Sequence, residues 1–175
     1  MLSDDVIYLR KLEREDLEQT YEWFNTPYVY LIMGVESPVS RASQARWFDA
    51  MEADPTKIVF ALCLQEGHRH VGNVSLDHID RRHRNARISI FIGEKEFQGI
   101  GLGSRAMRLL VQYAFDYLNL HKLWSKARAD DEELDRWYER LGFQCEGRQR
   151  EQEFLEGRYV DKNLWGLLRS DFNAK

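Results

Sequence analysis

The sequence predicts a single α/β (α+β) domain over residues 1–175, with helices that flank a central mixed, mostly antiparallel sheet. Three observations lead to this fold class. Hydrophobic side chains make up 43% of the 175 residues, enough for one core of ordinary size. Apolar side chains recur at helical spacing in some segments and at strand spacing in others. The chain shows no internal repeat, no low-complexity tract and no linker.

The first third of the chain predicts one strand and two helices. Residues 6–9 have the composition of a strand, and apolar side chains at helical spacing follow in residues 17–24. A second helix begins after Ser40 or Ser43, either of which can cap it, and its inner face carries Trp47, Phe48 and Met51. The segment between these helices is irregular and aromatic, with Tyr28, Tyr30, Ile32 and Met33.

Three strands are predicted next, over residues 58–64, 71–78 and 88–92. Polar turns join them, which favours an antiparallel meander. A broad helical stripe then runs from Leu102 to Tyr117, directly after a glycine-rich loop.

The last third predicts a strand, a helix and two more strands. Residues 122–127 form the strand, and the helix begins at Asp130 or Asp131 and ends at Gly142. Acidic residues in the first turn of this helix suit the positive end of its dipole. Residues 154–168 form two strands around a turn at 156–158.

Composition excludes several classes of protein. The chain has 25 basic and 29 acidic residues, and a formal net charge of −4 argues against nucleic-acid binding. The longest apolar run, residues 58–64, is too short to cross a membrane. Cys63 and Cys145 form no CxxC pair, and the histidines lack zinc-ligand spacing. With no signal peptide at the acidic start, the sequence predicts a cytoplasmic protein without a metal.

The loop Phe-Gln-Gly-Ile-Gly-Leu-Gly-Ser at residues 97–104 is the strongest candidate for a binding site. Glycines leave backbone N–H groups open to a ligand, and the helix that follows favours negative charge at its start. A pyrophosphate would suit this loop. For an isolated glycine loop, a turn that only packs the helix on the sheet is the more common explanation. The loop lacks the lysine of a P-loop, and its G-x-G-x-G spacing is not the dinucleotide-binding fingerprint.

Four motifs in order resemble one family, the GNAT N-acetyltransferases. Residues 98–103 resemble its Q/R-x-x-G-x-G/A motif, and residues 137–143 resemble its Y-x-x-x-G-F helix end. Residues 9–17 and 156–168 resemble the branch with ribosomal-protein N-terminal-alanine and spermidine acetyltransferases. The resemblance implies the GNAT fold, whose sheet is split by an acetyl-CoA cleft.

The resemblance also implies residues for acetyl-CoA. The backbone of Phe91 and Ile92 would pair with the pantetheine arm and supply an oxyanion donor, and Gln98 would fix the glycine loop. The amides of Gly99, Gly101, Gly103 and Ser104 would hold the pyrophosphate. Asp131 stands where the family often has an asparagine near the pantetheine, although a role as the cap of its helix is the interpretation that we favour. Tyr138 stands where relatives place the acid that protonates the departing thiolate.

One departure from the family concerns the amine acceptor. Many relatives have glutamate at the position of Arg87, and strand alternation places Arg87, Ser89 and Phe91 on one face. An arginine cannot serve as a base there, but it can bind an anionic acceptor or lie on the surface. Arg87 and Asp77 are therefore the candidate acceptor residues. The general base stays open between titratable residues near one strand end or just before the glycine loop (Asp77, His78, Asp80, Glu94 and Glu96) and a water chain.

We therefore expect an enzyme that transfers an acetyl group from acetyl-CoA to a primary amine by direct attack, without a metal. The acceptor is a protein N-terminus or a small molecule such as a polyamine or amino sugar. Two alternatives stay open: a degenerate member that senses acyl-CoA, and a nucleotide-binding protein. A homodimer is compatible with the sequence, which contains no feature that determines the oligomeric state.

Overall fold

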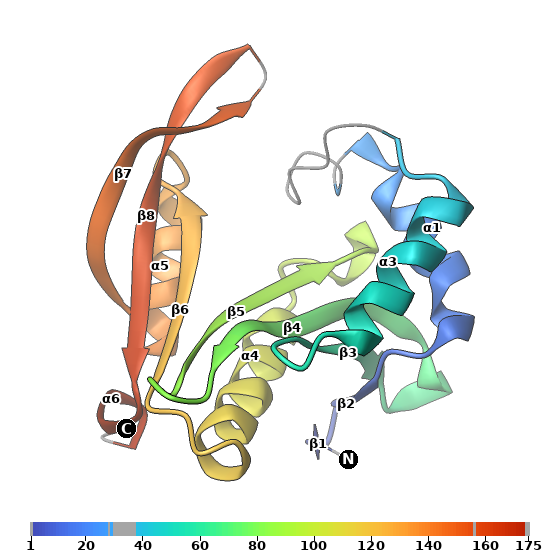
Figure 1. Ribbon diagram of the computed structural model, residues 1–175, viewed down its shortest axis with the longest axis horizontal. Coiled ribbons are helices and arrows are strands. Elements are labelled where there is room, and N and C mark those ends of the chain that lie inside the picture. The colour runs from blue at the N-terminus through green and yellow to red at the C-terminus, as the bar shows by residue number, and fades with distance from the viewer. Residues whose placement is uncertain (1, 28, 30–37, 156, 174–175) are drawn as a thin grey trace.

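The computed structural model describes residues 2–27, 29, 38–155 and 157–173, and its centre is one sheet of eight strands (Figure 1). In spatial order the strands are β1 (Leu2–Ser3), β2 (Ile7–Lys11), β3 (Ile58–Leu64), β4 (His70–Asp80), β5 (Asn85–Ile92), β6 (Lys122–Arg128), β8 (Arg158–Leu168) and β7 (Gln144–Leu155). Every neighbouring pair is antiparallel except β5 and β6, which are parallel. The prediction of a mixed, mostly antiparallel sheet is confirmed.

Five α-helices lie within the described residues: α1 (Leu17–Phe24), α3 (Arg41–Ala53), α4 (Leu102–Gln112), α5 (Glu132–Leu141) and α6 (Arg169–Asn173). Ser40 caps α3, since its side chain accepts the backbone N–H of Ser43. The long stripe predicted through Tyr117 is interrupted, because α4 ends at Gln112 and a π turn follows. The residues of the irregular segment named above, Tyr28, Tyr30, Ile32 and Met33, lie outside the described part.

The two faces of the sheet carry different helices. In β3 the side chains of Val59, Ala61 and Cys63 pack with Phe48 and Met51 of α3. The other face packs on α4 and α5 in the larger cluster of buried side chains. Alternation along the strands explains this division, because successive side chains point to opposite faces. Figure 1 shows α4 on one side of β4 and β5, and α1 and α3 on the other.

The sheet opens between β5 and β6. These strands pair only over Asn85–Lys122, Ala86–Leu123 and Arg87–Trp124. Beyond these pairs they diverge, as Figure 1 shows, while β6 continues to pair with β8 as far as Arg128. In the described structure, residues 88–92 of β5 therefore present an edge without a paired strand. This is the split that the family resemblance implies.

The prediction for the last hairpin was wrong at its start. We expected its first strand at Phe154, whereas β7 begins at Gln144. Residues 144–153 are almost entirely polar and largely exposed, so no alternation of apolar side chains marks them. They are extended because β8 provides a partner, which is tertiary context overriding local propensity. The β7–β8 hairpin extends well past the end of β6 (Figure 1).

Candidate active site

The glycine loop is held against the open end of β5. The Gln98 side chain donates from Nε2 to the carbonyl oxygen of Ile92 at 3.1 Å. Gly99 and Gly101 have φ of +72° and +93°, a region that only glycine enters without strain. Gly101 is the N-cap of α4, and the Arg105 amide closes the first turn onto its carbonyl at 3.2 Å. The amides of residues 102–104 are thus left without intrahelical acceptors and can meet an anion.

A contact across the split joins α4 to α5. Trp137 donates from Nε1 to the Ser104 hydroxyl at 2.9 Å. A Cβ added at Gly103 would lie 3.8 Å from Ile90, Ile92 and Trp137, which is ordinary packing. The Ser104 side chain is therefore engaged by Trp137, and its backbone amide is the group available to a phosphate.

Register determines which backbone groups of β5 face the split. The Gly93 amide donates to Val71 on β4 at 2.9 Å, and Phe91 is paired with Asn73 on the same strand. Successive residues of a strand direct their backbone N–H and C=O groups to opposite sides. Phe91 lies two residues before Gly93, so its backbone groups also face β4. The expectation that the Phe91 backbone meets the pantetheine is thereby corrected. The groups at the open edge belong to Ile90 and Ile92.

Tyr138 lies in an aromatic environment behind the split. Its side chain is 6% exposed, and its ring stacks on Trp165 at 5.3 Å between centroids. The hydroxyl lies 2.8 Å from the Ser125 hydroxyl. Burial raises the pKa of Tyr138, and the hydrogen bond with Ser125 only partly opposes this rise. The phenol therefore keeps its proton at neutral pH.

Ser125 is a site residue that the sequence analysis missed. It is 5% exposed and is the first residue of β6 beyond the segment paired with β5. The sequence pattern could have identified it, because strand alternation places Ser125 with Leu123 and Ala127 on the buried face of the strand. A hydroxyl on such a face needs a partner, and Tyr138 supplies it.

Asp131 caps the helix that carries Tyr138. Its side chain accepts the Leu134 amide at 2.9 Å, so the interpretation as a helix cap is confirmed. This cap sets where α5 begins and hence where Tyr138 lies along β6.

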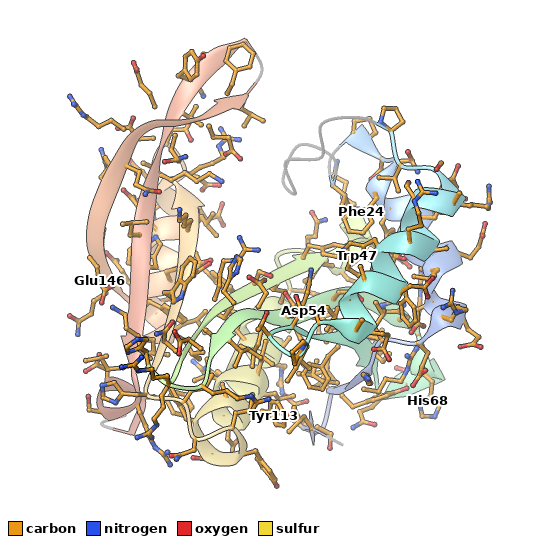
Figure 2. The ribbon with its side chains drawn as sticks, in the orientation of Figure 1. Phe24, Trp47, Asp54, His68, Tyr113 and Glu146 are labelled. Atoms are coloured by element: carbon orange, nitrogen blue, oxygen red, sulfur yellow. The ribbon has the colours of Figure 1, made fainter. Side chains whose placement is uncertain are left out.

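A cavity of about 380 Å³ lies between α1 and α3 on one side and β4 and β5 on the other. Figure 2 shows two of its aromatic residues, Phe24 of α1 and Trp47 of α3. The predicted face of Arg87, Ser89 and Phe91 is part of its wall. The lining residues are Phe24, Val39, Ser43, Gln44, Trp47, Lys57, Val59, Asn73, Val74, Ser75, Asp77, Arg87, Ser89, Ile90 and Phe91.

Two cations and one anion lie among these lining residues. Arg87 and Asp77 are cross-strand partners, with Nε and Oδ1 at 2.7 Å and Nη2 and Oδ2 at 3.1 Å. Lys57 places its ammonium 5.3 Å from the centre of the Trp47 ring. Asp77 is thus engaged by Arg87, and the described lining residues carry one more positive than negative charge. Of the other candidates for the base, Glu94 and Glu96 both pair with Arg69.

Gln44 was also missed by the sequence analysis. Thr20 donates its hydroxyl to the Leu17 carbonyl, so Gln44 must donate its Nε2 to Thr20, at 2.5 Å. Its Oε1 is left buried without a partner in the described structure. Gln44 lines the cavity, so the wall includes a residue with a buried acceptor that has no partner among the described residues.

Among the described residues, no group of three or more histidine, cysteine, aspartate or glutamate side chains is arranged to hold a metal ion. No helix in this part of the chain is long and apolar enough to cross a membrane.

Comparison with known proteins agrees with this geometry. A family model described as acetyltransferase (GNAT) domain matches residues 7–144. The spermidine N(1)-acetyltransferase of Escherichia coli (strain K12) is 32% identical over 172 residues, covering 91% of this chain and 84% of that protein. The ribosomal-protein-serine acetyltransferase of the same strain is 30% identical over 98 residues, covering 56% of this chain and 54% of that protein. A crystal structure of spermidine N-acetyltransferase from Vibrio cholerae, in complex with CoA and spermine, has a TM-score of 0.91 at 27% identity, covering 97% of this chain and 99% of that one.

Proposed function

Because this chain belongs to the GNAT acetyltransferase family and is an acetyl-CoA-dependent N-acetyltransferase, we propose that acetyl-CoA lies in the split between β5 and β6 and the amine in the adjoining cavity. The observation that carries the proposal is the position of β5. Its even-numbered residues, Ile90 and Ile92, direct backbone groups to the split, while its odd-numbered side chains, including Phe91, line the cavity. Strand β5 thus borders both the proposed acetyl-CoA site in the split and the proposed amine site in the cavity.

The donor is held by backbone groups. The Ile92 N–H and the Ile90 C=O pair with the pantetheine arm as a neighbouring strand would. The amides of residues 99–104 receive the pyrophosphate, since the start of α4 offers free N–H groups and a favourable dipole. Gln98 keeps this loop attached to β5. Asp131 borders the pantetheine from the start of α5 while it caps that helix.

The reaction is attack by the neutral amine on the thioester carbonyl carbon. A C–N bond forms, the tetrahedral oxyanion receives a backbone N–H from the open edge of β5, and the C–S bond then breaks. The departing thiolate takes the proton of the Tyr138 phenol, which the raised pKa keeps in place until then, and the proton that the attacking nitrogen loses restores the phenol by way of water. The amine must first lose its own proton, and water in the cavity accepts it, because Arg87 already binds Asp77.

The charge of the cavity bears on the acceptor. The described wall contains two cations, Lys57 and Arg87, and one carboxylate, Asp77, which pairs with Arg87. It therefore repels a polycation more than it attracts one. We therefore favour a monoamine that is neutral or anionic elsewhere, such as a peptide N-terminus, an amino acid or an amino-sugar nucleotide. Spermidine is the second candidate, and it is favoured by the relatives whose names include it.

Release of free CoA thiol from acetyl-CoA tests this proposal. The panel of amines holds spermidine, peptides with N-terminal Ala or Ser, amino acids, an aminoglycoside and an amino-sugar nucleotide. Release with one class identifies the acceptor. No release with any amine, while acetyl-CoA raises the melting temperature, would instead favour an acyl-CoA sensor.

A further inference from the structure

The side chain of His70 is 9% exposed, and its tautomer follows from its partners. Its Nε2 lies 2.9 Å from the carbonyl oxygen of Gly72, and a carbonyl can only accept a hydrogen bond. The Nε2 atom therefore carries the hydrogen. Burial lowers the pKa of His70, although the hydrogen bond with Asn73 and the charge of Asp16 oppose this, so the ring is neutral near pH 7.

This tautomer orients the neighbouring Asn73. The Asn73 Oδ1 lies 2.7 Å from His70 Nε2, so it shares the one hydrogen of that nitrogen with the Gly72 carbonyl, and only the oxygen end of the amide can accept it. The opposite end, Nδ2 with its two N–H donors, is left for the cavity that Asn73 lines. Asn73 is 5% exposed, so its amide is held in place. In the sheet it is paired with Phe91, beside the reacting end of the proposed donor site.

A second layer of contacts holds His70. The Trp23 ring meets it edge-on at 4.8 Å, while its Nδ1, which carries no hydrogen in this tautomer, lies 3.5 Å from Asp16 Oδ1 without a hydrogen bond. Asp16 is itself clamped by Arg10, whose guanidinium donates to both carboxylate oxygens at 2.6 and 2.7 Å. Burial opposes ionisation of Asp16, but the hydrogen bonds from Arg10 and the Glu13 amide outweigh it and lower its pKa. Packing against the Trp23 ring and the contacts of Nε2 with Gly72 and Asn73 keep His70 from turning away from Asn73.

We propose that Asn73, oriented by His70, determines acceptor specificity by donating a hydrogen bond to an oxygen atom of the acceptor. The inference rests on the proposed function, since it places the acceptor in the cavity. It names the acceptor class as an amine that also carries a carbonyl, carboxylate or hydroxyl group near the amino group. An amine without oxygen, such as a polyamine, leaves these buried donors without a partner, which is how polar sites reject such analogues.

Titration calorimetry of amines into the protein–CoA complex tests the proposal without requiring turnover. The probes are alaninamide, which carries a carbonyl oxygen, and isopropylamine, which lacks it. The wild type should bind alaninamide at least tenfold more tightly than isopropylamine. Asn73→Asp, which exchanges the two N–H donors for an acceptor, should abolish this preference and leave CoA affinity within twofold. Asn85→Asp, an equivalent change outside the cavity wall, should retain it.

His70 is tested as a positioning residue. His70→Phe removes the N–H that orients Asn73 and should reduce the preference severalfold. His70→Gln, which retains an N–H donor, should restore it. An equal affinity of the wild type for both probes, or a preference that survives Asn73→Asp, would overturn the inference. Binding with the expected preference but no CoA release with any amine would reject the proposed function, while the hydrogen bond from Asn73 to the bound amine would still be supported.

Discussion

Replacing Tyr138 with phenylalanine should separate its effect on chemistry from its effect on stability. The substitution removes the hydroxyl that lies 2.8 Å from Ser125 and leaves the Ser125 hydroxyl buried without this partner. An unsatisfied buried polar group costs about 1–3 kcal/mol. For a chain of this length that lowers the melting temperature by roughly 2–12 °C. Loss of a general acid should lower kcat by about 10²–10⁴-fold.

The double variant Ser125→Ala, Tyr138→Phe isolates the two effects. Removing both partners leaves neither hydroxyl unsatisfied, so most of the lost stability should return. Turnover should not return, because the proton donor is still absent. Ser125→Ala alone should lower stability but retain far more turnover than Tyr138→Phe. Tyr113→Phe is the matched control, because Tyr113 packs on Phe60 in a π turn away from the split.

The assay is CoA thiol release with the best acceptor of the panel, with acetyl-CoA affinity measured by calorimetry. Affinity for acetyl-CoA should change less than threefold in Tyr138→Phe. Turnover of that variant within twofold of the wild type would refute the role of Tyr138 as the acid. Recovery of turnover together with stability in the double variant would show that Tyr138→Phe acts only through folding.

Three further predictions concern stability and donor binding. Gly101→Ala should cost about 1–2 kcal/mol because Gly101 has a φ of +93°, and calorimetry should show weaker acetyl-CoA binding as the loop shifts. Gly93→Ala should unfold the protein or lower its melting temperature severely, since the new Cβ would lie 2.0 Å from the Trp23 ring. His70 has a pKa below its ordinary 6.5, so the unfolded chain binds more protons and the free energy of unfolding should fall as pH drops below about 6.5. His70→Phe should remove that part of the pH dependence in urea titrations, whereas the contribution of Asp16 should be lost only below its ordinary value of 3.8.

Prediction from sequence succeeded where a few neighbouring residues contain the information. Side-chain periodicity located α1, α3 and α5, and the acidic first turn and Gly142 marked the limits of α5. Loop glycines at positive φ were also found in this way, because that conformation depends on the residue type itself. Strand β7 was largely missed, because its polar residues are extended only through pairing with β8.

The sequence by itself determined the family, the glycine loop and the place of Tyr138 on its helix, because each is a local pattern or a short motif. The tertiary structure alone decided which groups meet across the sheet. It placed Ser125 against Tyr138, bound Arg87 to Asp77, and oriented Asn73 through His70. It also assigned the open edge of β5 to Ile90 and Ile92 rather than to Phe91. The physical reason is register: strand alternation sorts residues into faces, but only the pairing of distant strands decides which neighbour each face and each backbone group meets.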